Sequence, residues 1–139
     1  MSNNIREVRP KTADSEKITI NLGFVDLGHI DLLVAEKFYA NRTDFIRTAI
    51  RNQLERHVEA TRHSVARKAL ILGLRNYSRA ELEDTCRRGE RLDIRVLGLA
   101  TISEDVTPEL ARASIGSVEV LGAFHASPSV RKALADRMT

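Results

Sequence analysis

The sequence has little of what several large classes of protein require. Its 139 residues include one cysteine and no tryptophan, and its only aromatic residues are four phenylalanines and two tyrosines. A single cysteine excludes an internal disulfide framework and a cysteine-rich zinc site. So few aromatic side chains argue against stacking platforms for single-stranded nucleic acid. No apolar run approaches the roughly 20 residues of a membrane span, and the polar N-terminus lacks the apolar segment of a secretion signal. We therefore expect a cytoplasmic protein without a membrane partner.

Motifs of catalysis and of metal binding are also missing. The sequence holds no phosphate loop, nucleophile elbow or paired-carboxylate motif, so we expect neither an enzyme nor a cofactor. Metal sites need clustered histidine, cysteine or carboxylate ligands. Cys86 has no histidine within 20 residues. The histidines are dispersed along the chain at His29, His57, His63 and His125, and no metal site is expected within one chain.

Positive charge is concentrated in the N-terminal half. The net charge is +3. Residues 1–70 contain 12 Lys or Arg against 9 Asp or Glu, whereas residues 71–139 contain 10 of each. Between residues 42 and 68, seven positive residues face three negative ones. This excess fits contact with a polyanion such as nucleic acid, and a solvated basic helix face explains it as well.

Residues 17–23 alternate strictly between polar and apolar side chains, which predicts a half-buried strand. One face carries a long cation, a hydroxyl and an amide, which are groups that bind base edges in a major groove. An edge strand that shows its polar face to water accounts for the same pattern. The polar face consists of Lys17, Thr19 and Asn21, and the apolar face of Ile18, Ile20 and Leu22.

Two helices are expected after this strand. Apolar residues at helical spacing predict a first helix over residues 26–39, with Asp26 as its cap. A second helix is expected to start at Thr43 as N-cap, with Asp44 in its first turn, where the helix dipole favours a carboxylate. Arg51 could pair with Glu55, four residues later.

One strand and two short helices cannot bury enough surface alone. A lone strand leaves its backbone groups unpaired, so the strand is expected to pair with a second copy of the chain. Two antiparallel copies make a two-stranded ribbon with four helices behind it, and such a ribbon fits a major groove. The sequence therefore predicts a homodimer.

Residues 17–57, and above all the segment RTDFIRTAIR at 42–51, resemble a ribbon-helix-helix DNA-binding domain of the CopG/Arc/MetJ kind. The resemblance implies an intertwined dimer through an antiparallel β-ribbon whose outward strand residues read bases. It also implies a phosphate clamp at the start of the second helix. Residues 23–29 depart from the short Pro-containing turn of the family. Carried over by position, the base-contacting residues are Lys17, Thr19 and Asn21, and the phosphate-contacting residues are Asn41, Arg42, Thr43 and Arg47.

The C-terminal half contains an internal repeat. An aliphatic-Leu-Gly motif, four variable residues and a serine occur three times, at spacings of 25 and 24 residues. Each serine is a candidate helix N-cap, so each unit is expected to form a strand, a glycine, a loop and a short helix. The motifs begin at Ile71, Val96 and Val120, and the serines are Ser78, Ser103 and Ser127.

The predicted fold class is α+β: an N-terminal ribbon-helix-helix followed by a small α/β domain of about three βα units. The C-terminal domain would serve in oligomerisation or sensing, with a possible protein partner, or would only stabilise the dimer. The expected parts are a flexible arm at 1–16, the DNA-binding domain at 17–57, a helical linker at 58–70 and the βα-repeat domain at 71–139.

The function expected from these features is that of a bacterial, sequence-specific regulator of transcription. It would bind double-stranded DNA in the nucleoid as a homodimer or dimer of dimers, and would act as a repressor. Three alternatives stay open at this point. They are an architectural protein such as a plasmid partition or conjugation accessory, an antitoxin, and an interaction scaffold that does not bind DNA.

Overall fold

The structure, a computed structural model, describes residues 15–139 of the chain. The chain divides into two compact units, one that ends at Val58 and one that spans Glu59–Thr139. Most of the predicted arm, 1–16, lies outside the described residues.

The first unit contains two helices, α1 (Phe24–Ala35) and α2 (Arg42–Arg56). Helix α1 begins before Asp26, which lies in its first turn and does not cap it, and it ends well before residue 39. Its end is set by Lys37, whose φ of +68° places it in the left-handed region. The Lys37 amide donates to the Val34 carbonyl and the Phe38 amide to that of Leu33, which is the hydrogen-bonding pattern of a Schellman helix end.

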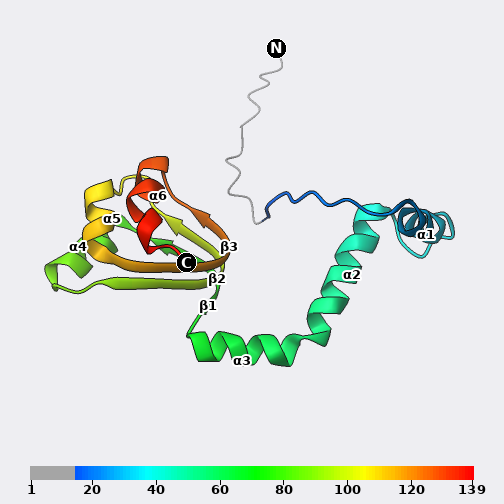
Figure 1. The fold of residues 1–139 in the computed structure, drawn as a ribbon, viewed down its shortest axis with the longest axis horizontal. Helices are drawn as coiled ribbons and strands as arrows, with labels where there is room; N and C mark the ends of the chain where they lie inside the picture. The colour runs from blue at the N-terminus through cyan, green and yellow to red at the C-terminus, as the bar shows by residue number, and fades with distance from the viewer. Residues whose placement is uncertain (1–14) are drawn as a thin grey trace, which may run out of the picture. The chain divides into compact units, whose positions relative to one another are not determined.

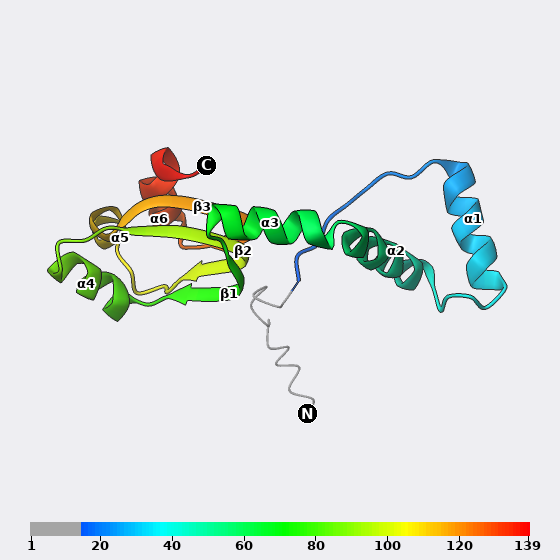
Figure 2. The same cartoon turned by 90° about the horizontal axis from the view of Figure 1, so that it is seen from below.

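The second unit is a three-stranded parallel sheet in the order β1-β2-β3, with three helices packed on one of its faces (Figures 1 and 2). Neighbouring helices of this layer contact one another, α4 with α5 and α5 with α6. The chain is therefore α+β. The elements of this unit are α3 (Val58–Lys68), β1 (Ile71–Tyr77), α4 (Arg79–Arg87), β2 (Leu92–Ile102), α5 (Pro108–Ser114), β3 (Ile115–His125), α6 (Pro128–Leu134) and the 3-10 turn η1 (Ala135–Arg137).

The hydrophobic core lies between the sheet and this helix layer. Alternate residues of β2 are fully or almost fully buried, as expected for a strand with one covered face. They pack against side chains that the three helices direct toward the sheet. The core includes Ile94, Val96, Ala100 and Ile102 from β2, Val118 and Phe124 from β3, and Leu82, Ala111, Val130 and Leu134 from the helices.

The strands pair so that equivalent residues of the three sequence motifs stand side by side. Gly73 pairs with Gly98, and Gly98 with Gly122. The glycines lie inside the strands, and the three or four residues after each one continue the strand, so the predicted loop directly after the glycine is wrong. Gly98 has a φ of +138°, and the carbonyl of Gly73 occupies the space that its Cβ would need. Each glycine thus adopts a positive φ, which other residues rarely adopt, and the strand continues past it.

The serine caps are confirmed at two of the three predicted positions. Ser78 accepts a hydrogen bond from the Glu81 amide at 3.2 Å, and Ser127 accepts one from the Val130 amide at 3.3 Å. The prediction for Ser103 is wrong, because Thr107 caps α5 instead. The Ser103 amide donates to the Tyr77 carbonyl at 3.0 Å, which ties this serine to the end of the neighbouring strand.

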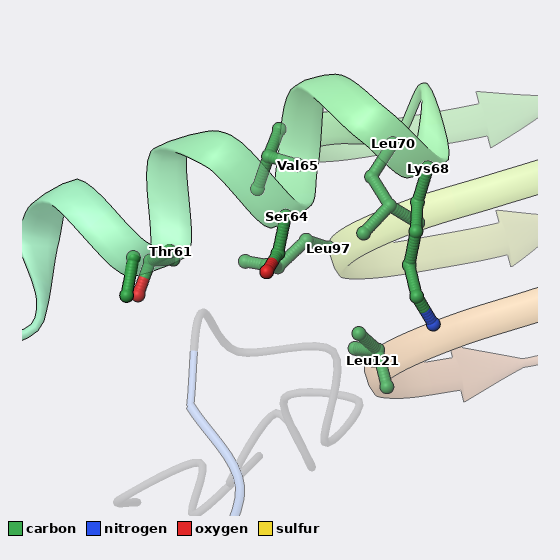
Figure 3. Close-up of a pocket in the computed structure, with 8 residues that line it drawn as sticks. Thr61, Ser64, Val65, Lys68, Leu70, Leu97 and Leu121 are labelled. Atoms are coloured by element: carbon green, nitrogen blue, oxygen red, sulfur yellow. The ribbon is translucent and has the colours of Figure 1, made fainter.

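The opposite face of the sheet is largely open. Leu72 and Leu74 on β1 are 71% and 70% exposed, and Leu121 on β3 is 48% exposed. Helix α3 passes over part of this face and borders a groove of about 310 Å³. Figure 3 shows Val65 of the helix and Leu97 and Leu121 of the strands lining it. The groove is mostly apolar.

Candidate nucleic-acid interface

The predicted strand at 17–23 is not formed by one chain alone. These residues precede α1 as an extended trace (Figure 1) and have no strand partner among the described residues. The physical reason is that a strand is defined by hydrogen bonds to a neighbour, and the single chain places none beside this segment. The predicted base-contacting residues, Lys17, Thr19 and Asn21, are all exposed.

The first unit leaves most of its apolar surface uncovered. From residue 15 to Val58, Ile30 is the one buried residue that the structure describes. Tyr39 and Phe45 meet edge to face at 5.0 Å between ring centroids, where α2 follows α1. The exposed large apolar residues of this part of the chain are Ile18, Ile20, Leu22, Phe24, Val25, Leu32, Phe38, Ile50, Leu54 and Val58. Exposed apolar residues in this number are typical of a surface that binds a partner.

Helix α2 is capped by Asn41, not by Thr43 as predicted. The Asn41 side chain accepts a hydrogen bond from the Asp44 amide at 2.8 Å, and Asp44 accepts one from the Ala40 amide at 3.0 Å. Two side chains thus stabilise the helix start, in a variant of the capping box in which the acidic side chain reaches the residue before the cap. Arg42 and Thr43 fall in the first turn, where backbone amides have no acceptor within the helix. The predicted phosphate-contacting residues therefore all lie on α2 or its cap.

Arg42 forms a two-pronged ion pair with Asp31 of α1. Its Nε and Nη2 atoms donate to Oδ1 and Oδ2 at 2.7 and 2.8 Å. These hydrogen bonds hold the pKa of the Asp31 carboxyl below its ordinary value and raise the pKa of Arg42. Sequence reasoning did not single out Asp31, because nothing in the sequence marks a partner eleven residues away.

Arg47 and Arg51 continue the basic surface of α2. They are four residues apart, so both lie on one side of the helix, and both are exposed. The pair of Arg51 with Glu55 that the spacing allowed does not form among the described residues. The two guanidinium groups are therefore available to a polyanion.

The ion pair leads to a prediction for Asp31→Asn. The substitution releases Arg42 and removes one negative charge, so we expect about threefold tighter binding to any duplex and a salt dependence steeper by about 0.9 in logarithmic slope. Binding titrations over a salt series measure both quantities. Asp26→Asn removes the same charge from α1 without releasing an arginine. The same slope in the two variants would show that Arg42 does not reach the DNA.

The described residues contain no group of three or more histidine, cysteine or carboxylate side chains that could hold a metal ion. Cys86 lies half-buried on α4 as a free thiol. No helix among residues 15–139 is long and apolar enough to cross a bilayer.

Comparison with known proteins identifies the family. The model of the ribbon-helix-helix transcriptional regulator family matches residues 13–131. This match runs beyond the residues that carry the resemblance in the sequence, 17–57, and includes all three strands of the sheet. No curated protein and no solved structure matches the chain. Regulators of this family bind DNA and usually dimerise, and they are generally not enzymes. On the extent of the match, the chain belongs to the ribbon-helix-helix transcriptional regulator family.

Proposed function

We propose that this regulator is a repressor that binds a specific double-stranded DNA site as a homodimer or a dimer of dimers, within the nucleoid of the cytoplasm. Residues 17–23 of two chains pair as an antiparallel ribbon that enters the major groove. The observation that carries this proposal is the uncovered apolar surface of the first unit. Ile18, Ile20 and Leu22 are exposed by 74%, 58% and 41%, although they alternate with polar residues as the inner face of a ribbon requires.

In the proposed complex, the outward side chains of the ribbon read the bases. Lys17 suits guanine, Asn21 suits adenine, and Thr19 binds either base or touches a thymine methyl. Their places in the strand, two residues apart, put all three on one face. The hydrogen bonds that they make with base edges would decide which sequence is bound.

The start of α2 supplies the contacts that hold the ribbon in place. Arg42 and Thr43 present first-turn amides, whose partial positive charge attracts a phosphate. The cap at Asn41 sets where this turn begins. Arg47 adds a charge one turn further along the helix. These contacts position the protein on any duplex and carry no sequence information.

Binding of the full chain to duplex DNA tests the proposal directly. A labelled duplex with the upstream region of the chain's own gene is compared with random duplex over a salt series. Preferential, salt-sensitive binding to the upstream region supports an autoregulating repressor. Equal binding to both duplexes would favour the architectural alternative, and no binding at low salt would contradict the DNA-binding function.

Asn21→Ala separates base reading from general attraction. We expect it to cost about 1–3 kcal/mol at the specific site, or roughly 5- to 150-fold in affinity, with little change on random duplex. Arg47→Ala is expected to weaken binding to both duplexes alike. Arg91→Ala, which removes an exposed charge from the C-terminal unit, serves as the matched control and should change neither. Unchanged discrimination in Asn21→Ala would contradict the assigned role.

A further inference from the structure

We propose that the C-terminal unit pairs with the same unit of a second copy of the chain through the free edge of β1. The two β1 strands run antiparallel about a two-fold axis, so the two three-stranded sheets become one sheet of six strands. This contact is separate from the ribbon at 17–23. It is independent of DNA binding, and its test needs no DNA.

The two edges of the sheet differ. The start of the β3 edge is covered by the last residues of the chain, since Met138 forms a parallel bridge with Val118 and the Thr139 amide donates to the Val118 carbonyl at 3.0 Å. Arg137 fastens this segment by donating to the Ile115 carbonyl at 2.6 Å. Among the described residues, nothing comparable lies along β1, whose strand partner is β2. Within residues 15–139, β1 is therefore the edge strand that no other segment covers at any point.

The β1 edge also lacks the features that usually keep an edge strand from pairing. It contains no lysine, proline or acidic residue. Its one charged residue, Arg75, is held by Glu81 of α4 and by the Tyr77 ring, with the guanidinium carbon 4.4 Å from the ring centroid. A second strand could approach without burying an unpaired charge.

The exposed apolar side chains of β1 would be buried if a second strand paired with this edge, which would stabilise the contact. Leu72 and Leu74 are 71% and 70% exposed on the open face. They stand next to Leu97 and Leu99 of β2, so they form the margin of an apolar surface that spans the strands. Pairing with a second β1 would bring four leucines together across the new strand pair, and cross-strand apolar pairs stabilise a sheet.

A second copy of this chain is the partner that fits the edge. Regulators of this family usually dimerise, so a second copy of the chain, with its own β1 edge, is near the first. Pairing of β1 with the β3 edge of another copy is opposed by the segment that covers the start of β3, whereas pairing of β1 with itself closes on a two-fold axis. Residues 71–139, which form the sheet and the helices packed on it, contain 10 positive and 10 negative residues, so this part of the unit has no net charge to repel its copy.

Cysteine cross-linking of the full chain tests the contact. In a Cys86→Ser background, Leu72→Cys, Leu74→Cys and Asn76→Cys each place a thiol on the open face of β1. A short bis-maleimide that spans about 8 Å reaches directly opposite and diagonal positions of an antiparallel pair. We expect a covalent dimer, seen by denaturing electrophoresis, for at least one of the three. Leu121→Cys, at an equally apolar position on β3, is the control and should stay monomeric.

Two results would overturn the proposal. One is the absence of cross-linked dimer at all three β1 positions when the thiols are shown to react with a monofunctional maleimide. The other is stronger cross-linking through Leu121→Cys, which would mean that the open faces pack against each other. Cross-linking at β1 with no DNA binding would leave this contact standing while the DNA-binding proposal fails.

Sedimentation provides a second test, which does not depend on the folding of the cysteine variants. In Ile20→Glu, which disables the ribbon, sedimentation of the full chain should still show a dimer held by β1. Adding Leu74→Lys should convert that dimer to a monomer with an unchanged circular dichroism spectrum. A monomeric Ile20→Glu chain at every concentration tested would contradict the proposal.

Discussion

Ile20→Glu is expected to abolish specific DNA binding. In the proposed ribbon, Ile20 lies on the inner face between the strands and the helices, where a carboxylate would have to be buried without a partner or keep the strands apart. Without the ribbon no element enters the major groove, and only the general attraction of the basic helices for DNA is left. We expect a loss of roughly 1,000-fold or more on the specific site, the lower limit of the usual difference between specific and non-specific binding.

Two variants control for this result, and gel-shift titration measures all three. Ile20→Val keeps an apolar, β-branched side chain and should bind nearly as tightly as the unaltered chain. Ala113→Glu adds the same negative charge at an exposed position of α5 and should have little effect. If Ile20→Glu bound the specific site as well as Ile20→Val does, the apolar face of residues 17–23 would not be the inner face of a ribbon.

Gly98→Ala is expected to remove a large part of the stability of the C-terminal sheet. Gly98 has a φ of +138°, and a Cβ there would overlap the Gly73 carbonyl oxygen and lie 2.9 Å from its carbon. The backbone strain costs about 1–3 kcal/mol. Overpacking against a neighbouring strand costs about 1–3 kcal/mol more. Whole domains are stable by only about 5–15 kcal/mol, so urea unfolding followed by circular dichroism should show a large drop in the midpoint.

Gly73→Ala is the matched control within the same row of glycines. Gly73 has a φ of +117°, yet nothing lies within 4 Å of where its Cβ would be. Measured in a Leu74→Lys background, in which β1 does not pair with a second copy, this variant should lose the strain contribution alone, about 1–3 kcal/mol. Equal losses in the two alanine variants would show that the close approach of the Gly73 carbonyl does not account for the effect.

Local features of the sequence were sufficient to predict several parts of the structure. Ser78 and Ser127 cap helices because a cap is formed by a side chain and an amide three residues apart, both visible in the sequence. Ser103 had the same signature and failed, because four further residues separate it from the helix that Thr107 caps. A local motif shows that a cap is possible, and the path of the following chain decides whether it is used.

The glycines show a second limit of local reasoning. Their spacing was visible, and the strands do place Gly73, Gly98 and Gly122 in one row. From the sequence alone, however, a glycine is equally compatible with the end of a strand and with a point inside a strand where another backbone comes close. The choice follows from the neighbouring strand, whose carbonyl fills the place of the missing Cβ.

For the candidate interface, the sequence by itself determined which kind of protein this is. The alternation at 17–23 and the arginine-rich segment at 42–51 predicted the family to which the chain belongs. Composition, periodicity and capping are properties of neighbouring residues, so one sequence contains them completely. They also indicated that the first part of the chain cannot bury its own apolar face.

Only the tertiary structure decided which distant groups meet. It paired Arg42 with Asp31 and not with a neighbour on its own helix. It also covered the start of the β3 edge with Met138 and left β1 open, although both strands carry similar apolar motifs. The physical reason is that these contacts join residues far apart along the chain. Whether two such residues meet depends on how the helices and strands between them pack, which local preferences do not specify.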